Sequence, residues 1–219
     1  MTGRFEMAER HLYLCTPDRD DLVGFVAACI EGGVDVVQLR EKEASARRIV
    51  DRAVLLRRAC NDLGAPFILN DRPDLALEAG ADGVHVGQDD VSARLARRLM
   101  GSDAIVGLST HAPDEVRESL EEPVDYVSAG PVVATPTKPG RPGTGIDYLR
   151  LAVAQADRPV FVTGGVSPET VPELAAAGAR HFVVVRYLTE ADDPRRAART
   201  LRDAVDRATD SAGTAGQVL

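Results

Sequence analysis

Two aspartates that follow neighbouring predicted strands have the residue type and spacing of a divalent-cation site. Asp71 ends the run Leu-Asn-Asp, and Asp90 ends the run Gly-Val-His-Val-Gly-Gln-Asp-Asp. They are 90 − 71 = 19 residues apart, about one strand-helix unit, so we expect both carboxylates at adjacent strand ends. Two carboxylates, completed by substrate phosphate oxygens and water, suit Mg²⁺. Helix capping is the alternative for either aspartate alone, but it explains the pair less well.

Another strand end carries two cations and an amide. Residues 38–42 read Gln-Leu-Arg-Glu-Lys. Because side chains alternate along a strand, Gln38, Arg40 and Lys42 share one face, and Leu39 and Glu41 share the other. Two cations on one face after two valines indicate an anion nearby, and the alternative is a solvated strand end.

A Pro- and Gly-rich segment, residues 130–145, is long for a connection in a barrel and is typical of a binding loop or lid. Within it Thr135, Thr137 and Lys138 can donate hydrogen bonds to phosphate oxygens. The last two predicted strands end in Gly164-Gly165 and in Val185-Arg186, where barrels often bind phosphate. We therefore expect two anion sites, with the aspartate pair beside the first.

One serine and two histidines remain open in their roles. Ser109 ends the run that starts at Ile105 and could bind a ligand or cap a helix. No Gly-x-Ser-x-Gly motif or acid–His pairing supports a hydrolase triad. His111 could be a base or a loop residue, while His85, inside a predicted strand, is more often a core histidine than a catalyst.

Eight short runs rich in β-branched residues supply the strands that would position these groups. The runs begin near His11, Asp35, Phe67, Gly83, Ile105, Asp125, Pro159 and His181. Amphipathic stretches such as residues 45–63 and 168–177 lie between them. The alternation predicts an α/β fold, a single-domain (β/α)8 TIM barrel over residues 1–208 with a flexible tail over 209–219. A doubly wound open sheet is the alternative, but the Gly-x-Gly-x-x-Gly turn typical of it is absent after the first run.

Composition narrows the class of protein. The chain has 219 residues and a net charge of −8, which disfavours a broad nucleic-acid surface. Its three cysteines form no Cys-x-x-Cys pair, so we expect neither disulfides nor zinc. No signal sequence and no apolar run of membrane-spanning length is present, so we expect a cytoplasmic protein that does not bind membranes.

Taken in order, these motifs resemble the thiamine-phosphate synthase family from about residue 11 to 194. The resemblance implies an Mg²⁺-assisted transferase with two small-molecule substrates. A pyrimidine diphosphate and a thiazole phosphate would give thiamine phosphate and pyrophosphate through a dissociative pyrimidine cation. It also implies Asp71 and Asp90 as metal ligands and Arg40, Lys42, Ser109 and Lys138 as catalytic residues. The implied substrate-binding set is Gln38, Leu39, Arg40, Glu41, Lys42, Asn70, Ser109, Thr135, Pro136, Thr137, Lys138, Gly165, Val185 and Arg186.

The sequence departs from the family at Arg186, where many members carry serine, which puts the side-chain part of the second phosphate site in question. Two other functions are possible. A thiazole tautomerase of the same barrel family would need a base such as His111 but not Asp71, Asp90, Arg40 and Lys138 together. A non-enzymatic phosphate-binding barrel would not need a metal pair and a second anion site. The sequence leaves open whether the chain forms a homo-oligomer.

Overall fold

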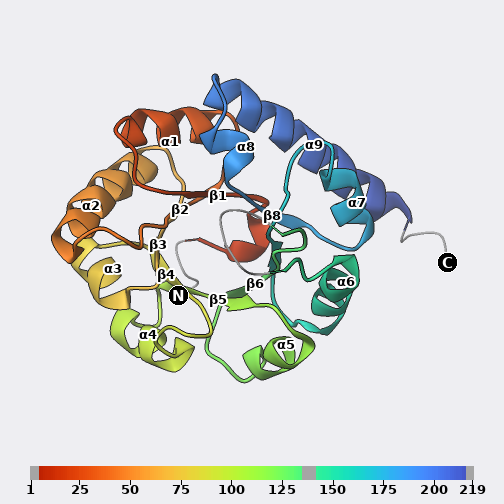
Figure 1. Cartoon of the computed structure of the whole chain (residues 1–219), viewed down its shortest axis with the longest axis horizontal. Coiled ribbons are helices and arrows are strands. Elements are labelled where there is room, and N and C mark those ends of the chain that lie inside the picture. The colour runs from red at the N-terminus through yellow and green to blue at the C-terminus, as the bar shows by residue number, and fades with distance from the viewer. Residues whose placement is uncertain (1–4, 135–141, 216–219) are drawn as a thin grey trace.

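Eight parallel strands close into a barrel in which each strand pairs with the next and the last pairs with the first. The computed structural model describes residues 5–134 and 142–215, with side chains through Asp210. The strands are β1 (Leu12–Thr16), β2 (Val36–Leu39), β3 (Phe67–Asn70), β4 (Gly83–Val86), β5 (Ile105–Thr110), β6 (Tyr126–Ala129), β7 (Val160–Val162) and β8 (His181–Val184). The predicted (β/α)8 barrel is confirmed, and the open sheet is wrong (Figure 1).

Helices surround the barrel and cover its outer face (Figure 1). They are α1 (Leu22–Glu31), α2 (Ala46–Asp62), α3 (Pro73–Ala79), α4 (Ala93–Met100), α5 (Pro113–Ser119), α6 (Ile146–Gln155), α7 (Val171–Ala176), α8 (Arg186–Thr189) and α9 (Pro194–Ala215). The larger apolar core lies between this ring and the sheet, as both faces of a parallel sheet require. Within the described residues, no helix is both long and apolar enough to cross a membrane.

Two helix boundaries differ from the sequence-based expectation. Helix α7 begins at Val171 rather than at residue 168, because the Thr170 hydroxyl accepts the Ser167 amide at 2.9 Å and donates to the Gly165 carbonyl at 2.7 Å. That turn precedes the helix instead of belonging to it. At the other end of the chain, α9 continues to Ala215, beyond the start of the predicted tail at Thr209.

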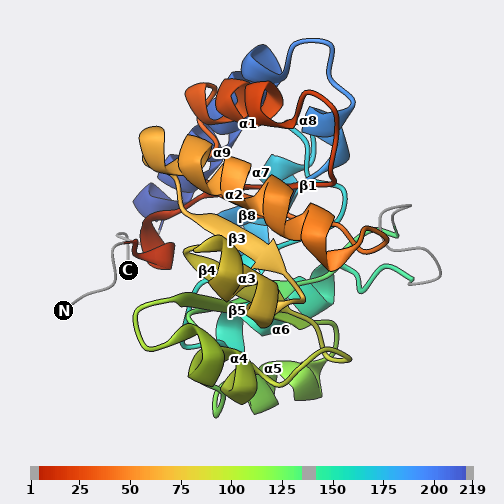
Figure 2. The ribbon, with the colours of Figure 1, turned by 90° about the vertical axis from the view of Figure 1, so that its left-hand side faces the viewer.

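The inside of the barrel changes from apolar to polar along its axis. At the amino ends of the strands, inward-facing side chains form a small apolar core. The short 3₁₀ helix η1 (Met7–Glu9), the red turn at the left of the barrel in Figure 2, closes this end. The members of this core are Met7, Tyr13, Val36, Ile68, Ile105, Tyr126 and Phe161. Two residues further along the strands, the inward side chains become polar, as with Gln38, Asn70 and Ser128. The polar layer therefore faces the carboxyl ends of the strands, where barrel enzymes have their sites.

A glycine opposite Tyr126 makes room for that ring across the barrel. Gly107 of β5 pairs in register with Tyr126 of β6, and a Cβ at Gly107 would overlap the tyrosine ring. The ring packs edge-on against Tyr13 and Phe161, with centroids 6.0 and 5.1 Å away. The Tyr126 hydroxyl can therefore reach the middle of the barrel.

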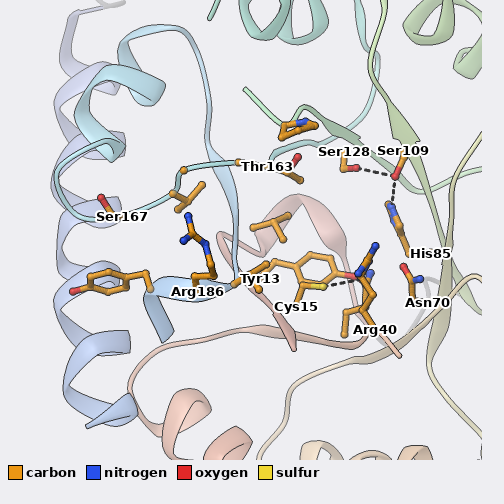
Figure 3. Close-up of a pocket in the computed structure, with 18 of the residues that line it drawn as sticks. Tyr13, Cys15, Arg40, Asn70, His85, Ser109, Ser128, Thr163, Ser167 and Arg186 are labelled. Carbon is orange, nitrogen blue, oxygen red and sulfur yellow. Dashed lines mark hydrogen bonds between the residues drawn. The ribbon is translucent and has the colours of Figure 1, made fainter. Parts of the chain in front are cut away.

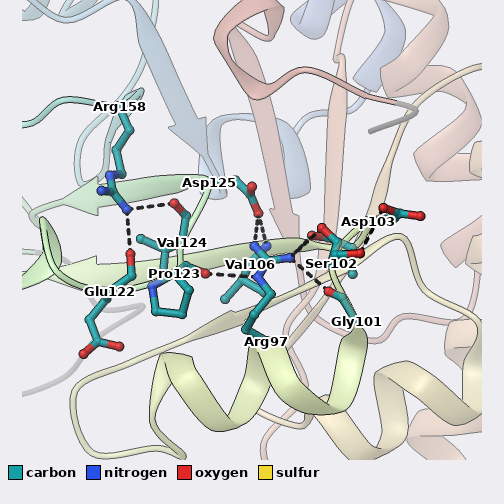
Figure 4. Close-up of polar contacts among 11 residues, drawn as sticks. Arg97, Gly101, Ser102, Asp103, Val106, Glu122, Pro123, Val124, Asp125 and Arg158 are labelled. Carbon is teal, nitrogen blue, oxygen red and sulfur yellow. Dashed lines mark hydrogen bonds and ion pairs between the residues drawn. The ribbon is translucent and has the colours of Figure 1, made fainter. Parts of the chain in front are cut away.

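The same polar contact occurs three times at the rim formed by the amino ends of the strands. Asp35, Asp82 and Asp125, here called the rim carboxylates, precede β2, β4 and β6. Each accepts a backbone N–H from the start of the preceding strand, and the donors are His11 and Leu12 (both 2.9 Å), Phe67 (2.9 Å) and Val106 (2.7 Å). Each also pairs with an arginine from the helix ring, namely Arg202, Arg57 and Arg97. Figure 4 shows the third of these contacts, Arg97 with Asp125, beside Arg158.

The rim carboxylates predict a measurable stability effect. Asp35→Ala should lower the free energy of unfolding by roughly 2–4 kcal/mol, because it leaves two backbone amides without their acceptor and removes one of the two carboxylates that pair with the Arg202 guanidinium. Urea unfolding measures it. The matched control is Asp51→Ala, whose carboxylate is 60% exposed and pairs along one helix with Arg47, so it should cost about 0.5 kcal/mol or less. Equal losses of unfolding free energy in the two variants would contradict the stabilising role of the Asp35 carboxylate.

Candidate active site

A cavity of about 360 Å³ opens at the carboxyl ends of the strands. Figure 3 shows its lining, which comes from β1 to β6, from β8 and from the segments that follow β2, β6, β7 and β8. Its floor is made by the polar layer inside the barrel, including Gln38, Asn70 and Ser109, all 5–8% exposed. The predicted residues Arg40, Gly165, Val185 and Arg186 also line it.

A second cavity of about 260 Å³ adjoins the first. The two share four lining residues, Arg40, Asn70, His85 and Ser109. The second contains the predicted aspartates and Lys42, together with His111 and the Gly87–Asp90 turn. The structure therefore brings the described members of both predicted sets to one mouth, with the acidic pair in the second cavity.

The two aspartates line the same cavity and are close enough for their carboxyl groups to interact. Burial, and then the neighbouring Asp90 carboxyl, raise the pKa of Asp71 above its ordinary value. The Lys42 ammonium lies 2.9 Å from the Asp71 carboxylate. The backbone of Asp71 has a φ of +63°, which a residue with a side chain adopts only when its surroundings impose it. Two close carboxylates held in this way need a positive charge beside them.

The helix-capping alternative is excluded for both aspartates. The residue before α3 is Arg72, and the cap of α4 is Ser92, whose hydroxyl accepts the Leu95 amide. Asp90 instead accepts the Gly87 amide at 2.7 Å, which folds its turn back onto the cavity. The donor set fits Mg²⁺ in its chemistry, since two carboxylates open toward a cavity leave room for phosphate oxygens and water. Among the described residues, no group of three or more His, Cys, Asp or Glu side chains could hold a metal ion.

Two arginines and an amide in the mouth have no protein partner within the described ranges 5–134 and 142–210. The Arg40 guanidinium, the Arg186 guanidinium and the Asn70 side-chain amide form neither a hydrogen bond nor an ion pair there, although each lines a cavity. In Figure 3, Arg40 and Arg186 lie to either side of Tyr13, which agrees with the order β8-β1-β2 around the barrel. Unpaired cations at two places in one mouth fit a ligand, or two ligands, with separate negative charges.

The region after β7 and β8 is shaped for close approach to the backbone. Gly164 and Gly165 have φ values of +91° and +76°, so a side chain there would be strained. A Cβ on Gly164 would also overlap Pro131. Val185 and Arg186 face the same cavity. This is the arrangement expected for the second anion site.

Some predicted residues lie elsewhere. Leu39 is 1% exposed and packs in the outer core. Glu41 is absent from the described lining of both cavities, and its carboxylate accepts the Glu43 amide. Thr135, Pro136, Thr137 and Lys138 lie outside the described residues. His111 lines the second cavity with its Nδ1 3.1 Å from the Glu115 carboxylate.

Sequence reasoning missed four inward side chains, Tyr13, Cys15, Tyr126 and Ser128, that line the first cavity. Tyr13 and Cys15 lie on either side of Leu14 in β1, and Tyr126 and Ser128 lie on either side of Val127 in β6. Leu14 and Val127 belong to the core between the sheet and the helices. That alternation was the available signal, because a polar or hydroxyl-bearing side chain in a buried barrel strand must find partners inside.

The fold and this mouth together define a (β/α)8 barrel protein with a polar, arginine-lined cavity at the carboxyl ends of its strands. The family follows from comparison with known proteins. The chain matches the family model described as thiamine monophosphate synthase over residues 12–188. It therefore belongs to the thiamine monophosphate synthase family.

Individual relatives agree with this family. The thiamine-phosphate synthase of Thermobifida fusca is 45% identical over 206 residues, which covers 92% of this chain and 94% of that protein. The thiamine-phosphate synthase of Mycolicibacterium smegmatis is 43% identical, with 90% and 92% covered. Among solved structures, the thiamine phosphate pyrophosphorylase of Pyrococcus furiosus superposes with a TM-score of 0.82 at 30% identity, covering 90% and 96%.

Proposed function

We propose that this chain is a thiamine-phosphate synthase that joins a pyrimidine diphosphate to a thiazole phosphate and releases pyrophosphate. In the proposed reaction, the bond between the pyrimidine methylene carbon and the diphosphate oxygen breaks first, and the bond electrons leave with the pyrophosphate. The thiazole nitrogen then forms a bond to the same carbon. The single observation that carries the proposal is the mouth, which holds a carboxylate pair and two guanidiniums with no partner in the described part of the chain.

The diphosphate is proposed to lie between Arg40 and the aspartate pair, where the two cavities meet. Arg40 and Lys42 would balance the charge that grows on the leaving pyrophosphate, and the unpartnered Asn70 amide would donate to it. Lys138 keeps the same role from the family resemblance. When bound, Mg²⁺ would be held by Asp71 and Asp90 and would neutralise part of that charge.

The thiazole phosphate is proposed to lie at the other end, against the Gly164-Gly165 turn and Val185. Backbone amides can approach a phosphate there because the glycines carry no side chain. Thr135 and Thr137 keep their role from the family resemblance. The apolar wall of the first cavity, which includes Val166 and Val183, would exclude water from the reactive cation between the two substrates.

The tautomerase alternative is less well supported by this mouth. A tautomerase needs one phosphate site and a base, whereas this site has an acidic pair and two arginines, Arg40 after β2 and Arg186 after β8. His111, the base that such an enzyme could use, lies in the acidic cavity and bonds to Glu115. A reducing cytoplasm stays the expected compartment, in keeping with three buried cysteines that form no disulfide.

The test is product formation from defined substrates. The chain is mixed with the pyrimidine diphosphate, the thiazole phosphate and Mg²⁺, and the product mass and the released pyrophosphate are measured together. Thiamine phosphate and pyrophosphate in equal amounts are expected. Absence of pyrophosphate with both substrates present would end the proposal.

Arg186→Ser is expected to raise the KM for thiazole phosphate by less than about tenfold and to leave kcat nearly unchanged. The Arg186 side chain is exposed, and a charge contact there contributes on the order of 1 kcal/mol or less. Steady-state kinetics with varied thiazole phosphate measures the change. The glycine turn stays intact in this variant and carries the remaining binding. A rise near a hundredfold would instead make Arg186 a principal phosphate ligand.

A further inference from the structure

A continuous chain of buried hydrogen bonds crosses the floor of the active-site cavity. It starts at Cys15 and Gln38, passes through Tyr13 and Tyr126, and ends at His85 and Ser109. These six side chains come from five strands, β1, β2, β6, β4 and β5, and are at most 8% exposed. Figure 3 shows part of it, with dashed lines from Ser109 to His85 and to Ser128.

The amide of Gln38 sets the direction of this chain. The Cys15 thiol donates to Gln38 Oε1 at 3.2 Å, which places Nε2 toward the Tyr13 hydroxyl at 2.8 Å. An amide nitrogen can only donate, so the Tyr13 oxygen accepts. The hydrogen of Tyr13 must then point away from Gln38.

The direction passes through both tyrosines to the histidine. Among the described residues, the Tyr126 hydroxyl, 3.0 Å away, is the one acceptor offered to the Tyr13 hydrogen. The Tyr126 hydrogen in turn points to His85 Nδ1, also at 3.0 Å. Burial raises the pKa of both tyrosines well above the ordinary value, so both keep their hydrogens. His85 Nδ1 is therefore an acceptor, and neutral His85 carries its hydrogen on Nε2.

The last bond decides what Ser109 can do. His85 Nε2 donates to Ser109 Oγ at 2.9 Å, and the Ser128 hydroxyl donates to the same oxygen at 3.5 Å. The oxygen of Ser109 is occupied as an acceptor, so its own hydrogen points into the two cavities that it lines. Ser109 is thereby prepared as a donor to an acceptor atom of the substrate.

We propose that Tyr126 is a positioning residue that fixes the Nε2–H form of His85 and so orients the Ser109 hydroxyl as a hydrogen-bond donor to the pyrimidine substrate. Tyr126 is 0% exposed and acts through His85 rather than through direct contact with a ligand. Gly107 lets its ring reach the histidine. Without the Tyr126 hydroxyl, His85 can move its hydrogen to Nδ1, and Ser109 can then donate to His85 instead of to substrate.

The first test reads the histidine directly. Nitrogen NMR of the labelled wild-type protein at neutral pH should show His85 with an unprotonated Nδ1, assigned by comparison with His85→Gln. His11 and His181 are internal controls of the opposite kind, because their Nδ1 atoms lie 2.9 and 2.5 Å from backbone carbonyl oxygens and must donate. A wild-type His85 with hydrogen on Nδ1 would overturn the proposal.

The second test is a double-variant cycle, and its kinetic arm rests on the proposed function. Tyr126→Phe keeps the ring packing and should lower kcat by about tenfold, the effect of one lost hydrogen bond. On the Ser109→Ala background, Tyr126→Phe should lower kcat by less than about twofold further. The reason is that Ser109, through which Tyr126 acts on the substrate, has already lost its hydroxyl. Tyr148→Phe is the matched control, a buried tyrosine that bonds to Thr110 Oγ1 at 2.7 Å outside the described cavity linings, and it should change kcat little on either background.

The outcomes separate the two proposals. An equal loss from Tyr126→Phe with and without Ser109 would overturn the positioning role even if wild-type turnover is normal. Wild-type protein without turnover would contradict the proposed function. The position of the His85 hydrogen would then be the sole test of the positioning role of Tyr126. An unprotonated Nδ1 together with a non-additive cycle supports both.

Discussion

Turnover is expected to fall by at least about 10²-fold in Asp71→Asn and in Asp90→Ala, and a chelator of Mg²⁺ should have a similar effect. The physical reason is that both carboxyl groups face one cavity, where burial and then the neighbouring Asp90 carboxyl raise the pKa of Asp71. A cation beside them is stabilised by both charges, and either variant removes one of them. The fold should stay near intact, because the two aspartates lie at the barrel mouth rather than in its core.

Pyrophosphate release measures this loss, and thermal unfolding checks the fold. Asp74→Asn is the matched control. It lies three residues from Asp71, but its carboxylate is 54% exposed and pairs with Arg72, so turnover should stay near that of the wild type. Full activity in excess chelator would contradict the assignment of Asp71 and Asp90 as Mg²⁺ ligands, whatever the activity of the variants.

Arg40→Met should lower kcat by roughly 10²–10³-fold, the loss usual for one electrostatic stabiliser of a transition state. Arg40 lines both cavities and has no ion-pair partner in the described part of the chain, so its charge is available to the leaving pyrophosphate. Lys42 differs, since Asp71 already neutralises it at 2.9 Å. Arg40 should therefore stabilise the charge that develops on the leaving pyrophosphate more than Lys42 does.

The split between kcat and KM tests this role. A rise in KM with kcat unchanged would mean that Arg40 binds the ground state and the transition state equally, contrary to the prediction. The control is Arg47→Met, a nearby arginine whose side chain is 85% exposed and pairs with Asp51. It should leave both constants near the wild-type values.

The strands could be predicted closely from the sequence. Each expected start lies within one residue of the observed one, for example His11 against Leu12 and Gly83 against Gly83. The reason is that strands buried on both faces read as short β-branched runs, bounded by polar or turn residues. The start of α7 was missed because a turn closed by Thr170 Oγ1 has the same local residues as a helix cap.

The site could be predicted only in part. Residues at strand ends, such as Arg40 and Asp71, are visible because charged side chains after a buried run need a partner. Gln38, Asn70 and Ser109 of the floor were predicted, but Tyr13 and Tyr126 were missed because they look like ordinary core residues. Their role depends on partners that are far apart in sequence, 113 residues between the tyrosines and 41 between Tyr126 and His85. No local pattern contains such a contact.

The rim carboxylates also bear on the order in which the barrel assembles. Asp35, Asp82 and Asp125 join strands that are local in the chain, with separations of 24, 15 and 19 residues. The seam between β1 and β8 instead joins His11 to Arg180 across 169 residues. Since the entropy lost on closing a loop grows with its length, the three local contacts can form while the ring is still open. We therefore expect these strand pairs to form early in folding and the β1–β8 seam to close late.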